Sequence, residues 1–366
     1  MMHRVFIPRF CRAIAILSLA ALAEQGALAQ SAPAEPFSRG AMLQDLSGKV
    51  ISPAYQELAL KSRELANSVG RLVKTPGLTT LADARRAWID AWLTASRVRC
   101  FQAGPLTDRD YGPTFYYWQV LTNRIEGVLN SSRPIDGPLI DELGVTTKGL
   151  FALEYLLFDR AGGASDGNGK PPSALELLSG AGSKRRGEYL LAVAGDVEAK
   201  AGQLAKEWSA PGEQGARAKF AGGGQASLNL LVNQLAMAME DITEHRLKLV
   251  LVLPGPISRQ LNRIEGSPSG TSLQSVLATL EGLRKMYLGG EGFGLDEALK
   301  RVNPAVAKRV RDQFEATLAA ARAINAPLEQ AISGNRASVQ NACEKARALE
   351  ILFKVDLVSA LGVTLT

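Results

Sequence analysis

The chain has 366 residues, of which 46% are hydrophobic, and a formal net charge of +6. Its lysines and arginines are interspersed with acidic residues along helical segments, without a dense basic patch or interleaved aromatics, so nucleic acid is excluded as an expected partner. Beyond the N-terminal segment the only histidine is His245, which excludes a zinc site built from two or more imidazoles.

The first 29 residues have the three parts of a secretory signal peptide. Three arginines precede the apolar run Ala13–Ala23, which is too short to span a membrane, and small residues at 27–29 then mark a cleavage point before Gln30. An uncleaved anchor is the alternative. No later stretch is long and apolar enough to cross a bilayer. We therefore expect residues 1–29 to be removed and the protein to reach the periplasm or cell envelope.

Helical periodicity dominates the remainder of the chain. Apolar residues recur at spacings of three and four over Leu81–Val98 and again over Leu228–Leu249. Asn303 followed by Pro304 is typical of a helix start, and a last helix is predicted from about Ala337 to Leu361. No alternating run of β-branched residues competes with these patterns, so the predicted fold class is all-α.

Two helical-bundle halves are expected, because the chain without its signal peptide is longer than one compact core usually holds. The Gly-, Ser- and Asn-rich residues 162–173 predict a flexible connection between a first bundle at 30–161 and a second at 174–366. The pentapeptide N-R-I-E-G at Asn123–Gly127 returns at Asn262–Gly266, and each copy precedes a helix that contains Leu-Glu. This shared order predicts an internal duplication.

Two cysteines remain after removal of the signal peptide, Cys100 and Cys343. In an oxidising compartment they could form a disulfide that closes a very long loop and fastens the two halves together. The alternative is two separate buried thiols, because free cysteine packs well as a small apolar residue.

The segment Lys148–Phe158 carries the main candidate for a functional residue. It is predicted to be a helix that is apolar on nearly every side, and it places one carboxylate, Glu154, in the core. A buried carboxylate must be paired, hydrogen-bonded, protonated or bound to a metal. Glu154 therefore either lines a pocket between the halves or forms a structural pair, for which Arg124 is the expected partner.

Other charged residues are weaker candidates for a site. Glu281 and Arg263 are the counterparts of Glu154 and Arg124 in the second half, although Glu281 also has ordinary salt-bridge spacing to Arg284 and Lys285. Asp241 and His245 lie one helical turn apart and could hold a metal with a third ligand from elsewhere. More commonly such a cluster is a solvated helix flank, since a metal site needs three or four converging ligands.

Taken together, several of these segments resemble the imelysin family. The resemblance rests on the Trp88 helix followed by Gly104-Pro105, on Gly149–Phe158, on Leu280–Leu283 with Tyr287, and on the ending Asp356–Val363. It implies two four-helix-bundle-like halves, export to the cell envelope and an association with iron acquisition.

Some members of that family are classed as metallopeptidases through a G-x-H-x-x-E motif, which here occupies Gly149–Glu154. Phe151 stands at the histidine position and cannot ligate a metal, so metal binding and peptidase activity do not carry over. No cofactor is predicted, and a bound iron or zinc ion is unsupported by the number of ligands. We expect a non-enzymatic protein that binds an unidentified small ligand or envelope protein where the halves meet. The alternatives are a metallopeptidase with carboxylate ligands and a structural envelope protein.

Overall fold

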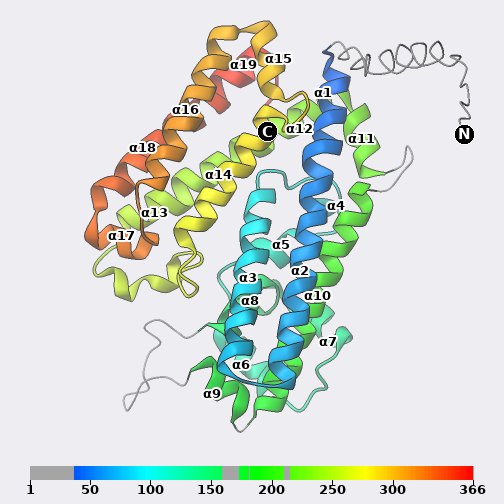
Figure 1. Ribbon diagram of the computed structural model, residues 1–366, viewed down its shortest axis with the longest axis vertical. Helices are drawn as coiled ribbons and strands as arrows, with labels where there is room; N and C mark the ends of the chain where they lie inside the picture. The colour runs from blue at the N-terminus through cyan, green and yellow to red at the C-terminus, as the bar shows by residue number, and fades with distance from the viewer. Residues whose placement is uncertain (1–36, 159–172, 181, 210–214, 366) are drawn as a thin grey trace, which may run out of the picture. The chain divides into compact units, whose positions relative to one another are not determined.

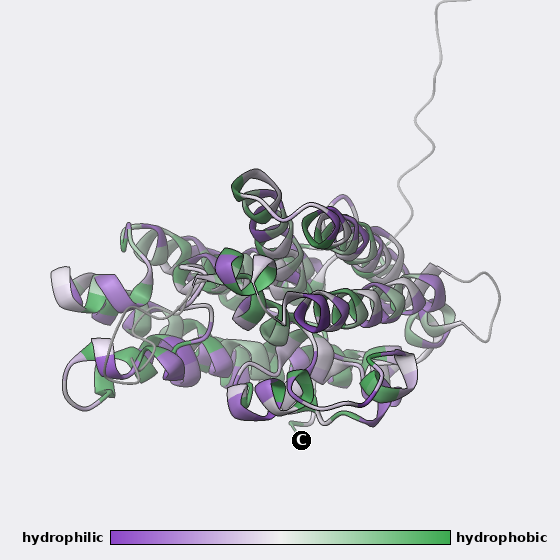
Figure 2. Cartoon of the chain, turned by 90° about the horizontal axis from the view of Figure 1, so that it is seen from below, coloured by the Kyte–Doolittle hydropathy of each residue, from purple (hydrophilic) through white to green (hydrophobic). Residues whose placement is uncertain are grey.

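A computed structural model describes residues 37–158, 173–180, 182–209 and 215–365, and every regular element within these ranges is a helix. The prediction of an all-α protein is therefore confirmed for the described part of the chain. Most helices carry both hydrophobic and hydrophilic residues, as expected for helices that bury one face (Figure 2). None of the described helices combines the length and the apolar character needed to cross a membrane.

One group of helices packs around the long helix α2 (Ser52–Lys74). Its buried face includes Tyr55, Leu58, Leu65 and Leu72, whose spacings of three and seven residues place them on one side. The helices α2, α3 (Leu78–Val98) and α10 (Ser183–Ser209) run side by side, and α8 (Leu150–Leu157) packs against α3 and α10 (Figure 1).

Short helices connect the members of this first group. Between α3 and α8 the chain forms α4 (Pro105–Asp108), α5 (Gly112–Tyr116), α6 (Thr122–Leu129), α7 (Gly137–Glu142) and η2 (Val145–Thr147). Before and after α10 lie α9 (Ala174–Ser179) and α11 (Ala216–Gly222). Ser173 caps α9 through a reciprocal capping box with Glu176.

A second group consists of the helices that follow residue 223. The helix α16 (Pro304–Arg322) packs against α18 (Arg336–Ile351) and α14 (Ser272–Leu288), and α12 (Gly224–Glu240) packs against α18. The helices α15 (Leu295–Val302) and α17 (Leu328–Gly334) complete the group, with the single-turn helices η4 (Ile257–Arg259) and η5 (Leu261–Arg263) before α14. The predicted start at Asn303 is confirmed, since its side chain accepts a hydrogen bond from the amide of Val306 at 3.2 Å.

Three helices continue through π-helical turns without a break. The turn η1 (Leu46–Ile51) joins α1 (Arg39–Asp45) to α2, η3 (Asp241–Leu247) joins α12 to α13 (Lys248–Val252), and η6 (Leu352–Leu357) joins α18 to α19 (Val358–Leu361). Such turns are rare and occur frequently at functional sites. The turn η3 supplies two residues, Asp241 and Arg246, to a buried network of charges.

The two groups meet where α14 crosses α3. A Cβ atom added at Gly282 of α14 would lie only 2.0 Å from the carbonyl oxygen of Arg97 on α3, so the close approach of these helices requires glycine. This crossing anchors the second group to the helix that also supports α8.

The predicted division into a first bundle at 30–161 and a second at 174–366 stays a prediction. The signal peptide and most of residues 162–173 lie outside the described residues. The helix α10 follows that connection in sequence yet packs with α2, which precedes it. The internal duplication stays a prediction, because one copy of N-R-I-E-G lies in the α-helix α6 and the other spans the 3₁₀ turn η5 and the loop after it.

In this structure both cysteines are free thiols, Cys100 buried and Cys343 half-buried. The Cys100 sulfur donates to the carbonyl oxygen of Arg97 at 3.3 Å, and the Cys343 sulfur lies 3.9 Å from the carbonyl oxygen of Thr243. The two sulfurs thus contact different backbone carbonyls.

Candidate functional site

A groove of about 850 Å³ lies where the second copy of N-R-I-E-G faces α8. The groove is lined by residues 117–122, by Thr146, by α8 with Phe158, and by part of the segment 258–268. Two predicted site residues, Glu154 and Arg263, line it. Asn262 and Ile264 of the second N-R-I-E-G line it as well, and that either residue or Glu154 binds a ligand stays a prediction.

Glu154 is held at the groove by Ser269 rather than by Arg124. Its side chain is only 4% exposed, and its Oε1 accepts hydrogen bonds from the backbone amide of Ser269 at 3.2 Å and from the hydroxyl at 2.6 Å. Arg124 lies exposed on α6, so the predicted pair is wrong. A serine on a loop can approach a carboxyl group that an arginine on the surface cannot reach.

Burial favours the protonated, neutral form of the Glu154 carboxyl at pH 7. Desolvation raises the pKa of Glu154 to about 8, against the opposing effect of the two Ser269 hydrogen bonds. Glu265 and Glu329 are near enough for their negative charge to raise this pKa further. Because Oε1 accepts both Ser269 hydrogen bonds, the proton of the neutral acid belongs on Oε2. Glu154 can therefore donate one hydrogen bond to a ligand.

Gly149 explains how α8 begins beside the groove. Its φ of +83° lies in the region that only glycine adopts without strain, and an added Cβ would lie 2.4 Å from the carbonyl oxygen of Thr114. One residue later, the Leu150 carbonyl accepts a hydrogen bond from the indole nitrogen of Trp88 at 2.7 Å. Backbone contact on one side and the indole on the other fix where α8 starts, and hence where Glu154 lies.

Phe151 occupies the third position of the Gly149–Glu154 motif and lies on the groove wall. Its ring meets Trp92 edge-on at a centroid distance of 4.8 Å and Trp88 at 6.3 Å. Such edge-to-face contacts are the favoured aromatic geometry. Phe151 therefore acts as an apolar member of an aromatic cluster.

The loop after the second N-R-I-E-G brings Ser269 to Glu154. Gly266 has a φ of +72°, and its carbonyl accepts a hydrogen bond from the amide of Thr271 at 2.8 Å, which closes the turn. The Ser269 hydroxyl also lies 2.8 Å from that of Thr271. The short run Gly266–Gly270 is thus a structural turn whose serine reaches across to α8.

A buried charge network holds the base of this loop. Glu265 lies 2.7 Å from Arg99 and 2.9 Å from Arg246, and Asp241 lies 3.1 Å and 2.9 Å from the same two arginines. The two Arg246 contacts have ion-pair distances, although their angles fall outside hydrogen-bond geometry. Arg246 is 5% exposed and Glu265 is 8% exposed. The network joins the end of α3, the turn η3 and the loop that carries Ser269.

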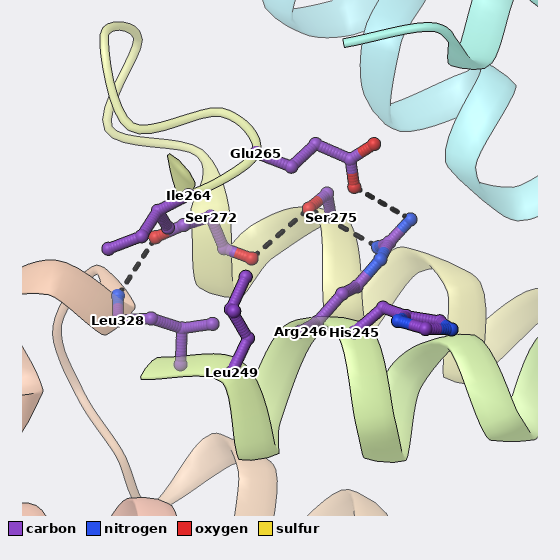
Figure 3. Close-up of a pocket in the computed structure, with 8 residues that line it drawn as sticks. All are labelled: His245, Arg246, Leu249, Ile264, Glu265, Ser272, Ser275 and Leu328. Atoms are coloured by element: carbon purple, nitrogen blue, oxygen red, sulfur yellow. Dashed lines mark hydrogen bonds and ion pairs between the residues drawn. The ribbon is translucent and has the colours of Figure 1, made fainter. Parts of the chain in front are cut away.

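A small void lies beside this network, as Figure 3 shows. Its volume of about 10 Å³ is near the lower limit for one water molecule. Arg246 and Glu265 border it on one side, and Ser272 and Leu328, joined by a hydrogen bond, on the other (Figure 3). Ile264 borders both this void and the groove, so the network and the groove share one wall.

Glu281 lies at a different place from the one that the predicted duplication implied. It lines a separate cavity of about 340 Å³ and lies 4.0 Å from Arg97 and 3.4 Å from Arg322. The pairing with Arg284 that its spacing indicated is not formed, because Arg284 contacts Glu315. Glu281 and Glu154 therefore do not share a groove.

Among the described residues, no third His, Cys, Asp or Glu is placed with Asp241 and His245 to hold a metal ion. Although burial raises the pKa of Asp241, Arg246 and Arg99 bring that pKa below its usual value, and both oxygens of the carboxylate face these arginines. His245 is exposed on η3. Within the described ranges, no group of three or more His, Cys, Asp or Glu side chains is placed to hold a metal ion.

Three residues of the site were not predicted from the sequence: Ser269, Arg99 and Arg246. The second N-R-I-E-G was a signal for the network, because its glutamate contacts both arginines. The first copy has a similar arrangement, in which Glu126 lies 2.7 Å from the buried Arg186. A glutamate in each copy thus pairs with a buried arginine.

Comparisons with known proteins agree with the resemblance. The sequence model of the imelysin family, described as Imelysin (Peptidase_M75), matches residues 51–353. A crystal structure of a candidate iron-regulated protein A precursor from Parabacteroides distasonis ATCC 8503 is similar, with a TM-score of 0.73 and 18% identity; 90% of this chain and 97% of that chain are covered.

A crystal structure of an imelysin-like protein from Psychrobacter arcticum 273-4 has a TM-score of 0.67 and 15% identity, and covers 90% of this chain and 98% of that chain. At these identities the two structures support the shared fold alone. No curated protein matches the sequence.

Proposed function

This chain belongs to the imelysin family, and on that premise we propose that it is an exported, non-enzymatic protein that binds a small ligand in the groove beside Glu154. The proposal of export is supported by the signal-peptide pattern of residues 1–29. The observation that carries the proposal of binding is the groove of about 850 Å³, which has the size of a small-molecule site. A purely structural protein has no need of such an opening beside a buried carboxyl group.

The residues at the motif do not fit a catalytic metal. Phe151 offers no donor atom, Oε1 of Glu154 is occupied by Ser269, and a neutral carboxyl is a poor ligand. The other described residues that line the groove include no His, Cys, Asp or Glu to supply a third and a fourth ligand, and two of them are the cations Arg259 and Arg263. These two cations would repel a metal ion rather than hold it.

The Ser269–Glu154 pair also does not fit an activated nucleophile. A serine attacks only when a neighbouring base takes its proton. Burial raises the pKa of Glu154 to about 8, so only a minor fraction of this carboxyl is ionised at pH 7, and the described residues that line the groove include no histidine to take the proton instead. The pair is better suited to hydrogen bonding with a ligand.

A role linked to iron uptake is proposed from the relatives of this chain. One solved structure that shares this fold is described as a candidate iron-regulated protein A precursor. We expect loss of this chain from its native host to slow growth under iron limitation and to leave growth in iron-rich medium unchanged. Equal growth in both media would contradict the role linked to iron uptake and would leave the proposal of binding intact.

The binding proposal is tested with a variant that fills the groove. Ser258 is exposed and lines the groove, so Ser258→Trp occupies its space without cutting into the core. Ser132→Trp is the matched control, because Ser132 is exposed in the loop after α6 and does not line the groove. A small-molecule library is screened by the shift in melting temperature of the unchanged protein and both variants.

A ligand of this groove raises the melting temperature of the unchanged protein and of Ser132→Trp, and leaves Ser258→Trp unaffected. Compounds that stabilise all three proteins equally bind elsewhere. If every compound behaves in that way, the groove is not a binding site and the proposal is wrong.

A further inference from the structure

We propose that the groove selects organic anions that carry an aromatic ring. This inference rests on the proposed function and names the chemical class of its ligand. It is carried by three properties of the groove lining: the arginines, the aromatic side chains and the single acid.

Two arginines give the groove a positive charge. Arg259 in η4 and Arg263 in η5 are exposed and both line the groove. Among the described residues, neither guanidinium group has an ion-pair or hydrogen-bond partner, whereas most other arginines in these ranges contact a carboxylate or a carbonyl. A guanidinium group without a protein partner is free to bind a carboxylate or similar anion through two parallel hydrogen bonds.

No described acid on the groove lining neutralises these arginines. Glu154 is the only Asp or Glu among the described residues that line it, and its carboxyl is neutral at pH 7 because it is buried. An anion that enters meets two cations and a carboxylic acid that can donate a hydrogen bond through Oε2. A cationic ligand would meet the same two cations at a cost.

Aromatic side chains form a large part of the lining. Of the nineteen described residues that line the groove five are aromatic, compared with 6% of the whole chain, and they are Tyr117, Trp118, Phe151, Tyr155 and Phe158. All five come from residues 117–158, whereas both arginines come from the segment 258–268. Flat rings stack on such surfaces or meet them edge-on, with a gain beyond the burial of apolar area. The arginines and the aromatic side chains thus fit the two parts of one ligand, an anionic group and a ring.

Calorimetry with three simple probes separates the contribution of the ligand's negative charge from that of its aromatic ring. We measure binding of 2-naphthoate, of 2-naphthylmethylammonium and of cyclohexanecarboxylate to the full chain at pH 7. The proposal predicts that 2-naphthoate binds at least about tenfold more tightly than either of the others, because each of them lacks one of the two matched groups.

Arginine variants test which side chains bind the carboxylate of the probe. Arg259→Gln and Arg263→Gln are each expected to weaken 2-naphthoate binding by about tenfold, and high salt should weaken it as well. Arg63→Gln is the matched control: Arg63 is exposed on α2, does not line the groove, and should leave the affinity unchanged. All three side chains are on the surface, so the variants are expected to fold; circular dichroism checks this.

The outcomes distinguish this inference from the proposed function. Equal or tighter binding of the ammonium probe would overturn the preference for anions, and equal binding of the cyclohexane probe would overturn the preference for rings. If 2-naphthoate does not bind but the melting-temperature screen finds another ligand that Ser258→Trp blocks, the inference fails and the function stands. If neither is found, both fail. Asn262→Trp, which also lines the groove, is used if Ser258→Trp does not fold.

Discussion

Ser269 donates two hydrogen bonds to one carboxylate oxygen of Glu154, from its amide at 3.2 Å and its hydroxyl at 2.6 Å, across 115 residues of sequence. This contact joins α8 to the loop before α14. It holds Glu154, the one Asp or Glu among the described residues that line the groove, through its Oε1.

Replacement of Glu154 by glutamine should remove a pH dependence of stability. Burial raises the pKa of Glu154 to about 8 in the folded protein, whereas an unfolded glutamate titrates near its ordinary value. The folded state therefore holds one more proton between those two values. Stability from this group is fully present below the unfolded pKa and is lost as pH rises toward 8, by on the order of 1.4 kcal/mol per pH unit.

Urea unfolding from pH 5 to pH 8 of the unchanged protein and of Glu154→Gln tests this. The difference between their unfolding free energies should change in favour of the glutamine variant as pH rises. Glu329→Gln is a useful comparison, since burial also raises the pKa of Glu329. A constant difference for Glu154→Gln would show that the carboxyl is ionised throughout.

Loss of one member of the buried charge network should lower the free energy of unfolding far more than loss of a surface ion pair. Arg246→Met leaves Glu265 and Asp241 in a buried place with only Arg99 as a partner. We expect a loss of about 3–5 kcal/mol in unfolding free energy. The control, Arg284→Met, breaks an exposed pair with Glu315 and should cost less than about 1 kcal/mol. Similar small losses for both would mean that the network does not hold the loop.

Gly149→Ala should destabilise the protein because alanine meets both a positive φ and a backbone contact of 2.4 Å at this position. A positive φ at a non-glycine residue costs about 1–3 kcal/mol, and displacement of Thr114 adds to it. Gly195→Ala is the matched control, since Gly195 lies in the middle of α10 with open space around it and should gain about 0.5–1 kcal/mol. Chemical unfolding measures both; an unaffected Gly149→Ala would contradict the described start of α8.

The state of the cysteines can be read from peptides. Protein isolated from cells is alkylated in denaturant without a reductant and digested. The peptides of Cys100 and Cys343 should both carry the alkyl group, because the two sulfurs contact different backbone carbonyls. In the native protein Cys100 should react slowly, since burial raises its pKa to about 12. A disulfide-linked peptide pair would contradict the separate thiols.

The sequence predicted the helices well, because their signals are local. Apolar spacing indicated α3 and α12 with η3, and Asn303 with Pro304 indicated the start of α16. The burial of Glu154 followed from the apolar character of its neighbours alone. Each of these features depends on residues within a few turns of one another.

The contacts of the site were predicted less well, because they join distant segments. Nothing near Glu154 in the sequence indicates that Ser269 is its partner, and Arg124 was a wrong choice made from a shared motif. The network of Arg99, Arg246 and Glu265 likewise needs three segments to meet. That Arg263 lines the groove while Glu281 does not depends on where η5 and α14 pack.

The most direct test of a ligand-binding groove without a catalytic metal is native mass spectrometry of the protein as isolated from cells, without added metal. A groove that binds an organic ligand predicts an organic adduct on the unchanged protein that is absent from Ser258→Trp and retained by Ser132→Trp. A stoichiometric zinc or iron adduct that disappears in Glu154→Gln would contradict it.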